Sequence, residues 1–173
     1  ADSTRKAVRD ALVQTMQSPA VESHLRREAG LLLGSMGWIP EALDTFVGVP
    51  PGRFQYGSGR DEHEIRDRYW IAKYPVTNSQ YARFLADCGP KEKEERLRPA
   101  FWDDYELSNP IFPVVGVTWD QARAYCDWLT EQLRSSGLPF LVWREGILYE
   151  PDIPVHSLTS RLPREEEWER AAR

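Results

Sequence analysis

The sequence predicts an α+β fold that is rich in loops and begins with a short helical hairpin. Seven Trp, seven Tyr and six Phe indicate a core built from large rings. Thirteen prolines and eleven glycines indicate frequent turns between the elements. Short segments of alternating polarity lie between segments of helical periodicity, and this mixture is typical of small sheets combined with helices.

The overall charge and hydropathy exclude several classes of protein. The 173 residues carry a formal net charge of -5, and their Lys and Arg residues are not clustered. A nucleic-acid partner is therefore not expected. No apolar run reaches the length of a membrane span, and no secretory leader is visible, so we expect no membrane partner and a cytoplasmic, bacterial protein.

The two cysteines, Cys88 and Cys126, are too few for a disulfide scaffold. We expect two free, largely buried thiols, and a single bridge between them stays open as an alternative. Cys126 lies on an apolar helical stripe, which favours a structural thiol over a nucleophile.

Residues 1–48 are predicted to form a helical pair. Ser3 is a candidate N-cap for the first helix, and Ser18 followed by Pro19 is a candidate start for the second. The inward face of the second helix is predicted to hold apolar residues, namely Val21, Leu25, Leu32 and Leu33. The pair is interpreted either as a cap on the following domain or as the end of a helical array.

Residues 49–173 are predicted to form a second unit. A strand carries Phe54 and Tyr56 on one side, and another strand leads into a helix that Thr77 caps. Thr118 caps a further helix. Residues 138–160 read as an insertion with two short strands, 141–143 and 147–149.

The last segment predicts a helix entered through Pro163, with carboxylates in its first turn, where the unpaired amides favour negative charge. Its residues look like the middle of a domain, so we expect the polypeptide to be incomplete. Four tryptophans in these segments are expected in the core: Trp70, Trp119, Trp128 and Trp168.

Four sequence blocks, in order, resemble the formylglycine-generating-enzyme family, also called the sulfatase-modifying-factor domain. The blocks are Pro51 to Ser58, Lys73 to Tyr81, Pro113 to Leu129, and Arg161 to Arg173. The resemblance implies a C-type-lectin-like fold of which this chain holds the N-terminal portion. The motif positions that it marks as structural are Gly52, Phe54, Gly57, Thr77, Asn78, Tyr81, Trp119, Tyr125, Cys126, Trp128, Arg161, Leu162, Pro163, Glu167 and Trp168.

The resembled family is chemically mixed, so its fold does not settle the function. Some members oxidise a substrate cysteine to formylglycine with oxygen and copper, others use non-haem iron, and others bind ligands or are variable proteins of diversity-generating retroelements. The family's catalytic cysteines and calcium ligands follow the Arg-Leu-Pro block and so fall beyond Arg173. The resemblance therefore implies no catalytic, cofactor or metal residue in this chain, with copper or calcium only in the C-terminal half.

Clustered metal ligands are also not evident from the residues themselves. The histidines His24, His63 and His156 are not spaced for a shared helical metal face. Two acidic groups, 61–64 and 103–106, lack the spacing of a calcium loop and are interpreted as solvated loops.

Two functional hypotheses follow. The first is a module that binds a protein or a small molecule, with the C-terminal half of the same domain as a further partner. It is favoured because the chain supplies no catalytic group. The second is a formylglycine-generating oxidase whose catalytic cysteines lie beyond Arg173.

Overall fold

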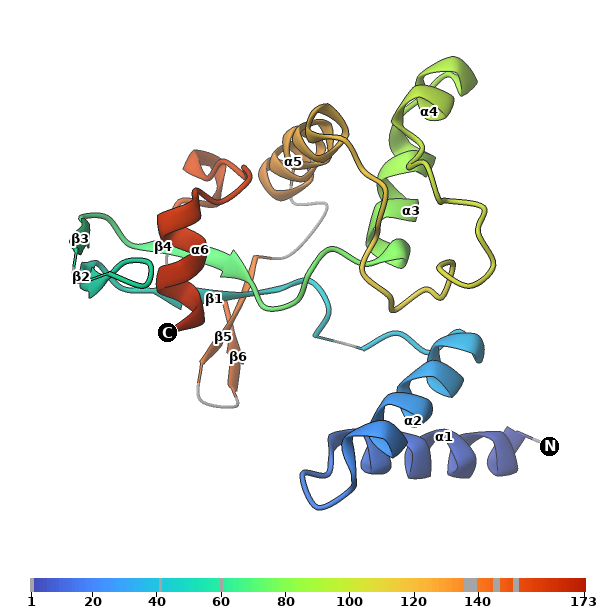
Figure 1. The fold of residues 1–173 in the computed structure, drawn as a ribbon. Coiled ribbons are helices and arrows are strands. Elements are labelled where there is room, and N and C mark those ends of the chain that lie inside the picture. The colour runs from blue at the N-terminus through green and yellow to red at the C-terminus, as the bar shows by residue number, and fades with distance from the viewer. Residues whose placement is uncertain (1, 41, 60, 136–139, 145–146, 151–152) are drawn as a thin grey trace.

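A computed structural model describes residues 2–40, 42–59, 61–135, 140–144, 147–150 and 153–173. The chain begins with two packed helices, α1 (Asp2–Gln17) and α2 (Ser23–Ser35). The remaining elements form a mixed arrangement of short strands and helices (Figure 1). The predicted α+β class is confirmed.

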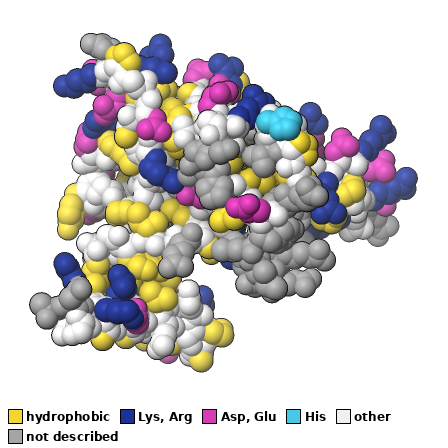
Figure 2. All heavy atoms as spheres, turned by 180° about the vertical axis from the view of Figure 1, so that it is seen from behind, with side chains coloured by type: hydrophobic (Ala, Val, Ile, Leu, Met, Phe, Trp, Pro, Cys, Tyr) yellow, Lys and Arg dark blue, Asp and Glu magenta, His cyan; other side chains and the backbone are white. Residues whose placement is uncertain are grey.

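The buried face of α2 is partly made of small residues, and a hydrogen bond joins the two helices. Ala29, Gly30, Leu33 and Gly34 are the buried residues of α2, and the Arg26 side chain donates to the Met16 carbonyl across the pair at 3.0 Å. The predicted apolar face was partly wrong, because Leu25 and Leu32 are about half exposed. Figure 2 shows hydrophobic side chains at the surface of this pair, at lower left.

The predicted start of the second helix at Ser18 is also wrong. The Ser18 amide donates to the Gln14 carbonyl and so extends the first helix, and the Val21 amide closes a turn onto the Ser18 carbonyl. Helix α2 begins only at Ser23, and Glu22 before it forms no side-chain cap hydrogen bond.

The helical pair contacts the rest of the chain through a close approach of Gly34 to Asn109. A Cβ atom on Gly34 would lie 1.9 Å from the Asn109 Oδ1 atom. The Asn109 side chain donates to the Leu31 carbonyl at 3.1 Å and accepts from the Ile111 amide at 3.2 Å. Only glycine leaves room for this contact.

The main sheet has the order β4-β1-β5-β6. β1 (Thr45–Val49) pairs antiparallel with β4 (Tyr69–Ala72) and parallel with β5 (Leu141–Arg144), which pairs with β6 (Ile147–Tyr149). The segment 138–160 thus supplies two strands to this sheet, while the turn at 145–146 lies outside the described residues. β2 (Gly52–Gln55) and β3 (Glu62–Ile65) form a separate hairpin.

Two helices begin with the predicted threonine caps. Thr77 precedes α3 (Asn78–Asp87), and Thr118 precedes α5 (Trp119–Arg134); each forms a capping box with the glutamine three residues later. The short helix α4 (Lys91–Leu97) lies between them. Local side-chain hydrogen bonds therefore set where both core helices start.

Aromatic rings fill the core between α3 and α5. Tyr81 is 1 % exposed, and its ring lies 5.2 Å from that of Phe84 and 5.7 Å from that of Tyr125. A second cluster joins Leu133, Phe140 and Val142 beneath the sheet. Aromatic side chains thus form a large part of the core, as the composition predicted.

The last elements are the 3-10 turn η1 (Val155–Ser157) and α6 (Glu165–Ala172), which lies across β4 and the hairpin (Figure 1). The Tyr69 hydroxyl donates to the Glu167 carbonyl at 2.6 Å, and the Gly57 amide donates to the Glu169 carboxylate at 2.9 Å. These bonds place α6 against strands that precede it by about a hundred residues.

The expectation that four tryptophans are core residues holds only in part. Trp70 and Trp128 are half-buried, whereas Trp119 and Trp168 are each 63 % exposed. The Arg123 guanidinium lies 4.9 Å above the Trp119 ring, which gives this ring a partner at the surface. Both cysteines are free and buried, as predicted. No described helix is long and apolar enough to span a bilayer.

We predict that Gly34→Ala lowers the free energy of unfolding by about 1–3 kcal/mol, because the new methyl group displaces Asn109 and leaves partly buried polar groups unpaired. Chemical denaturation followed by circular dichroism measures the change. Gly30→Ala is the matched control, since its Cβ meets only Met16, at 3.4 Å. Equal stability of the two variants would contradict the prediction.

Candidate functional site

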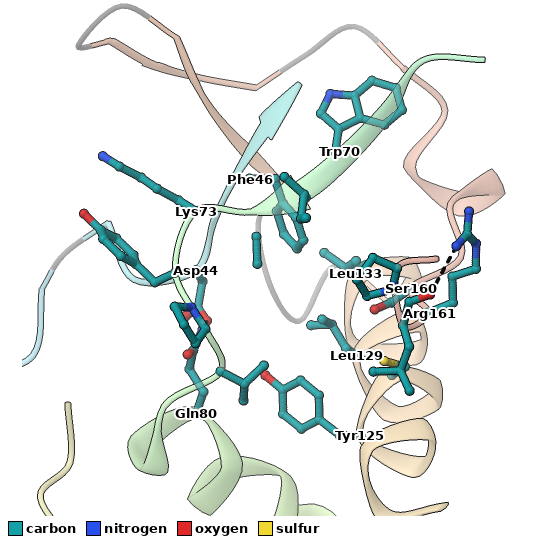
Figure 3. Close-up of a pocket in the computed structure, with 18 of the residues that line it drawn as sticks. Asp44, Phe46, Trp70, Lys73, Gln80, Tyr125, Leu129, Leu133, Ser160 and Arg161 are labelled. Atoms are coloured by element: carbon teal, nitrogen blue, oxygen red, sulfur yellow. Dashed lines mark hydrogen bonds between the residues drawn. The ribbon is translucent and has the colours of Figure 1, made fainter. Parts of the chain in front are cut away.

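An open groove of about 770 Å³ lies between the main sheet and α5. One wall is the sheet, with Phe46 and Trp70, and the facing wall is α5, with Leu129 and Leu133 (Figure 3). Its rim includes two extended stretches of backbone, 68–76 and 157–163. Because most of these lining groups are apolar, the groove is suited to contact an apolar ligand surface.

A polar network closes one end of the groove. The Gln80 side-chain amide donates to the Asp44 carboxylate at 2.9 Å, and Arg83 forms an ion pair with the same carboxylate. Tyr125 lies nearby, and burial raises the pKa of its hydroxyl above the ordinary range. The Asp44 carboxylate therefore already has two partners within the protein, Arg83 and Gln80.

A second polar cluster lies at the other end. The Arg161 guanidinium donates to both Glu167 carboxylate oxygens, at 2.7 and 2.5 Å. The Arg164 amide donates to the same carboxylate at 2.8 Å, which satisfies a free amide at the start of α6. These bonds, with that of Arg161 the largest, hold the pKa of Glu167 below its usual range.

The groove brings together about half of the motif positions marked by the sequence. Eight of them line it, from α3, α5, the approach to α6 and α6 itself: Tyr81, Tyr125, Cys126, Arg161, Leu162, Pro163, Glu167 and Trp168. Residues of the block Lys73 to Tyr81 and of the block Arg161 to Arg173 therefore line the same groove, although the two blocks are far apart in sequence.

The remaining motif positions lie away from the groove and have structural contacts. The Asn78 side chain donates to the Leu107 and Asn109 carbonyls at 2.7 and 2.9 Å, which fixes the long connection against α3. Thr77 caps α3. Gly52, Phe54 and Gly57 lie on or beside the hairpin, where the Arg170 guanidinium lies 5.7 Å from the Phe54 ring.

Sequence reasoning did not identify Asp44, Gln80, Arg83 and Ser160 as neighbours of the groove. Gln80 had a readable signal, because it stands three residues after Thr77 in the pattern of a capping box. Asp44 had none, since the sequence between it and α3 gives no indication that the two meet. Long-range contacts of this kind depend on the tertiary fold alone.

Burial raises the pKa values of two titratable side chains that line the groove, Cys126 and Tyr81. Burial raises the pKa of the Cys126 thiol, which makes it a poor nucleophile. Burial also raises the pKa of Tyr81 to about 12, and its hydroxyl donates to the Leu97 carbonyl at 2.8 Å. Among the described residues, no three His, Cys, Asp or Glu side chains meet in a metal-binding group.

The geometry defines a loop-rich α+β domain with an apolar groove between a small sheet and a capped helix. A family model described as the Sulfatase-modifying factor enzyme 1-like domain matches residues 38–173. The chain belongs to this family, which confirms the resemblance drawn from the four sequence blocks. The match includes both stretches of backbone that border the groove.

Three curated relatives are similar to about half of this chain. The serine/threonine-protein kinase Pkn1 of Chlamydia trachomatis serovar L2 is 30% identical over 111 residues, 54% of this chain and 18% of that protein. The kinase pkn1 of Chlamydia caviae is 31% identical over 114 residues, with the same coverage. The uncharacterized protein YfmG of Bacillus subtilis is 30% identical over 118 residues, 52% of this chain and 23% of that protein. The matched region thus spans about a fifth of each relative.

We predict that Glu167→Gln removes part of the acid sensitivity of the fold. The depressed pKa means that the Glu167 carboxylate stabilises the folded state above its ordinary pKa of about 4.5, and that this contribution is lost as the pH falls through the folded value. The variant should therefore be less stable at pH 7 and lose less stability between pH 5 and 3, by thermal unfolding. Glu166→Gln, the same charge change in the same turn, is the control. Parallel curves for the wild type and Glu167→Gln would be the contrary result.

Proposed function

We propose that residues 38–173 act as a binding module whose groove receives a protein segment or a small molecule. The observation that carries this proposal is the open, apolar groove of about 770 Å³, whose volume falls within the range of about 300–1,000 Å³ that is usual for ligand sites. The polar side chains lie at the two ends of the groove. There they can orient a bound ligand while its apolar part contacts the apolar walls.

The electrostatics of the groove support binding over catalysis. Asp44 is paired with Arg83 and bonded by Gln80, and Glu167 is held by Arg161. A general acid or base needs a proton that it can exchange near the working pH. The hydrogen bonds from Arg161 lower the pKa of the Glu167 carboxyl and so favour its charged form. The groove therefore offers shape and apolar surface as its means of recognition.

The family supports a second candidate function. The match to the Sulfatase-modifying factor enzyme 1-like domain over residues 38–173 favours a formylglycine-generating oxidase. In that proposal, the cysteines and the copper that carry out the chemistry belong to polypeptide outside residues 1–173. The present chain would then contribute the scaffold and part of the substrate surface.

The binding proposal predicts that the groove takes up an apolar probe. We expect 1-anilinonaphthalene-8-sulfonate to bind with enhanced fluorescence, and Ala72→Trp to weaken the binding roughly tenfold, because the ring occupies part of the groove. Ala86→Trp, the same substitution on the exposed face of α3, is the control. The proposal fails if both variants bind the probe equally well.

The two candidate functions are separated by a reaction test. A polypeptide that extends past Arg173 is incubated with a sulfatase-motif peptide, copper and oxygen, and the peptide mass is measured. Under the binding proposal, we expect the substrate cysteine to stay unchanged. Formation of formylglycine would instead establish the oxidase.

A further inference from the structure

The indole ring of Trp168 borders the groove with most of its surface exposed. Trp168 is a groove-lining residue and is 63 % exposed. Within the described part of the chain, its side chain forms no hydrogen bond and no ring contact. Trp119 is exposed to the same extent but differs, because the Arg123 guanidinium lies over its ring. Trp168 therefore offers ring surface and an indole N–H to a ligand.

Hydrogen bonds hold the backbone on both sides of this ring. Before it, the Glu167 carboxylate accepts from Arg161, and the Glu167 carbonyl accepts from the Tyr69 hydroxyl at 2.6 Å. After it, the Glu169 carboxylate accepts from the Gly57 amide at 2.9 Å. The ring is thus presented from a fixed position, so little ordering entropy is lost there when a ligand stacks on it.

Aromatic rings also form the sheet wall of the groove. Phe46 and Trp70 lie on this wall (Figure 3). The Phe140 ring, which also lines the groove, lies 5.1 Å from that of Phe46 and 5.8 Å from that of Trp70. Aromatic rings attract one another through offset-stacked and edge-to-face contacts beyond the burial of apolar area. A planar aromatic ligand therefore gains more from this wall than an aliphatic ligand of the same size.

The charged residues of the groove are more cationic than anionic. The described residues with charged side chains that line it are Asp44, Arg68, Lys73, Arg161 and Glu167. Both carboxylates already have a cationic partner, because Arg83 pairs with Asp44 and Arg161 pairs with Glu167. The lining therefore complements a ligand that carries negative charge.

Arg68 is the cation of the lining that is available to such a ligand. It is exposed, and it forms neither an ion pair nor a hydrogen bond with another described residue. The next residue, Tyr69, bonds through its hydroxyl to the carbonyl of the residue before Trp168. One hydrogen bond thus joins the two backbone segments that carry Arg68 and Trp168. A guanidinium has the planar donor geometry that suits a carboxylate.

We propose that the ligand of the groove is a small planar aromatic molecule with an anionic group. Its ring stacks on Trp168 and against the aromatic wall, and its anionic group pairs with Arg68. An aliphatic anion would lose the ring contacts, and a neutral aromatic molecule would lose the ion pair. The inference rests on the proposed binding function and names the chemical class of the ligand.

Three related probes test the proposal on the whole chain by calorimetric titration. 2-Naphthoate is planar and anionic, decahydro-2-naphthoate is anionic but saturated, and 2-naphthalenemethanol is planar but neutral. We expect 2-naphthoate to bind about fivefold more tightly than the saturated acid, because of stacking. It should bind about threefold more tightly than the neutral alcohol, because of an exposed ion pair. Equal affinity for 2-naphthoate and either of the other probes overturns the proposal.

Two variants, each with a matched control, assign the preferences to residues. Trp168→Leu should lose the preference for the planar acid, whereas Trp119→Leu, equally exposed in the wild type but outside the groove lining, should keep it. Arg68→Gln should lose the preference for the charged probe, whereas Arg66→Gln, with a side chain 85 % exposed and outside the lining, should keep it. Preferences that survive in Trp168→Leu and Arg68→Gln contradict the proposal.

A measurement on the wild type covers the case in which a variant fails to fold. Addition of 2-naphthoate should shift the NMR signal of the Trp168 indole N–H and leave that of Trp119 unchanged. An unchanged Trp168 signal under saturating probe overturns the proposal.

The outcomes separate this inference from the proposed function. If the anilinonaphthalene probe binds but 2-naphthoate binds no better than its saturated counterpart, the inference fails alone. If neither probe binds, both proposals fail. If a polypeptide extended past Arg173 shields Trp168 from acrylamide quenching and no longer binds 2-naphthoate, protein occupies this site and the inference is overturned.

Discussion

The structure depends on the pairing of β1 along both of its edges. On one side it holds β4, which follows it closely in the chain, and on the other it holds β5, almost a hundred residues later. The parallel pairing with β5 requires a long crossover, and that crossover contains α3, α4 and α5. The ring-filled core between α3 and α5 is therefore placed beside the sheet by the same pairing that forms the sheet. The groove is the space left where helix and sheet diverge.

The parts of this fold that the sequence predicted are those fixed by local chemistry. Thr77 and Thr118 were recognised as caps because a hydroxyl before a helix satisfies a nearby amide whatever the rest of the chain does. Alternation placed Phe54 and Tyr56 on one side of a strand; Phe54 is buried there, whereas β2 ends at Gln55, before Tyr56. The family blocks were recognised for the same reason, since they contain these local patterns.

The parts that could not be predicted depend on which surfaces meet. Trp119 and Trp168 have large apolar side chains of the kind that usually fill a core, yet both side chains are mostly exposed. Ser18 has a hydroxyl that could cap a helix. Its amide instead continues the first helix, and its carbonyl accepts the Val21 amide in a turn. One polar end of the groove likewise arises from residues that are distant in sequence, because Asp44 pairs with Arg83. Propensity carries no information about such partners, because tertiary contacts decide them.

The contact between Gly34 and Asn109 is the first of several that connect the helical pair to the groove. Asn109 is bonded to α2 by its side chain, and its carbonyl accepts from Asn78 at the start of α3. Two residues further along α3, Gln80 bonds to Asp44 at the end of the groove. A short series of directional hydrogen bonds therefore runs from α2 through the start of α3 to the end of the groove, and the helical pair and the groove belong to one connected framework.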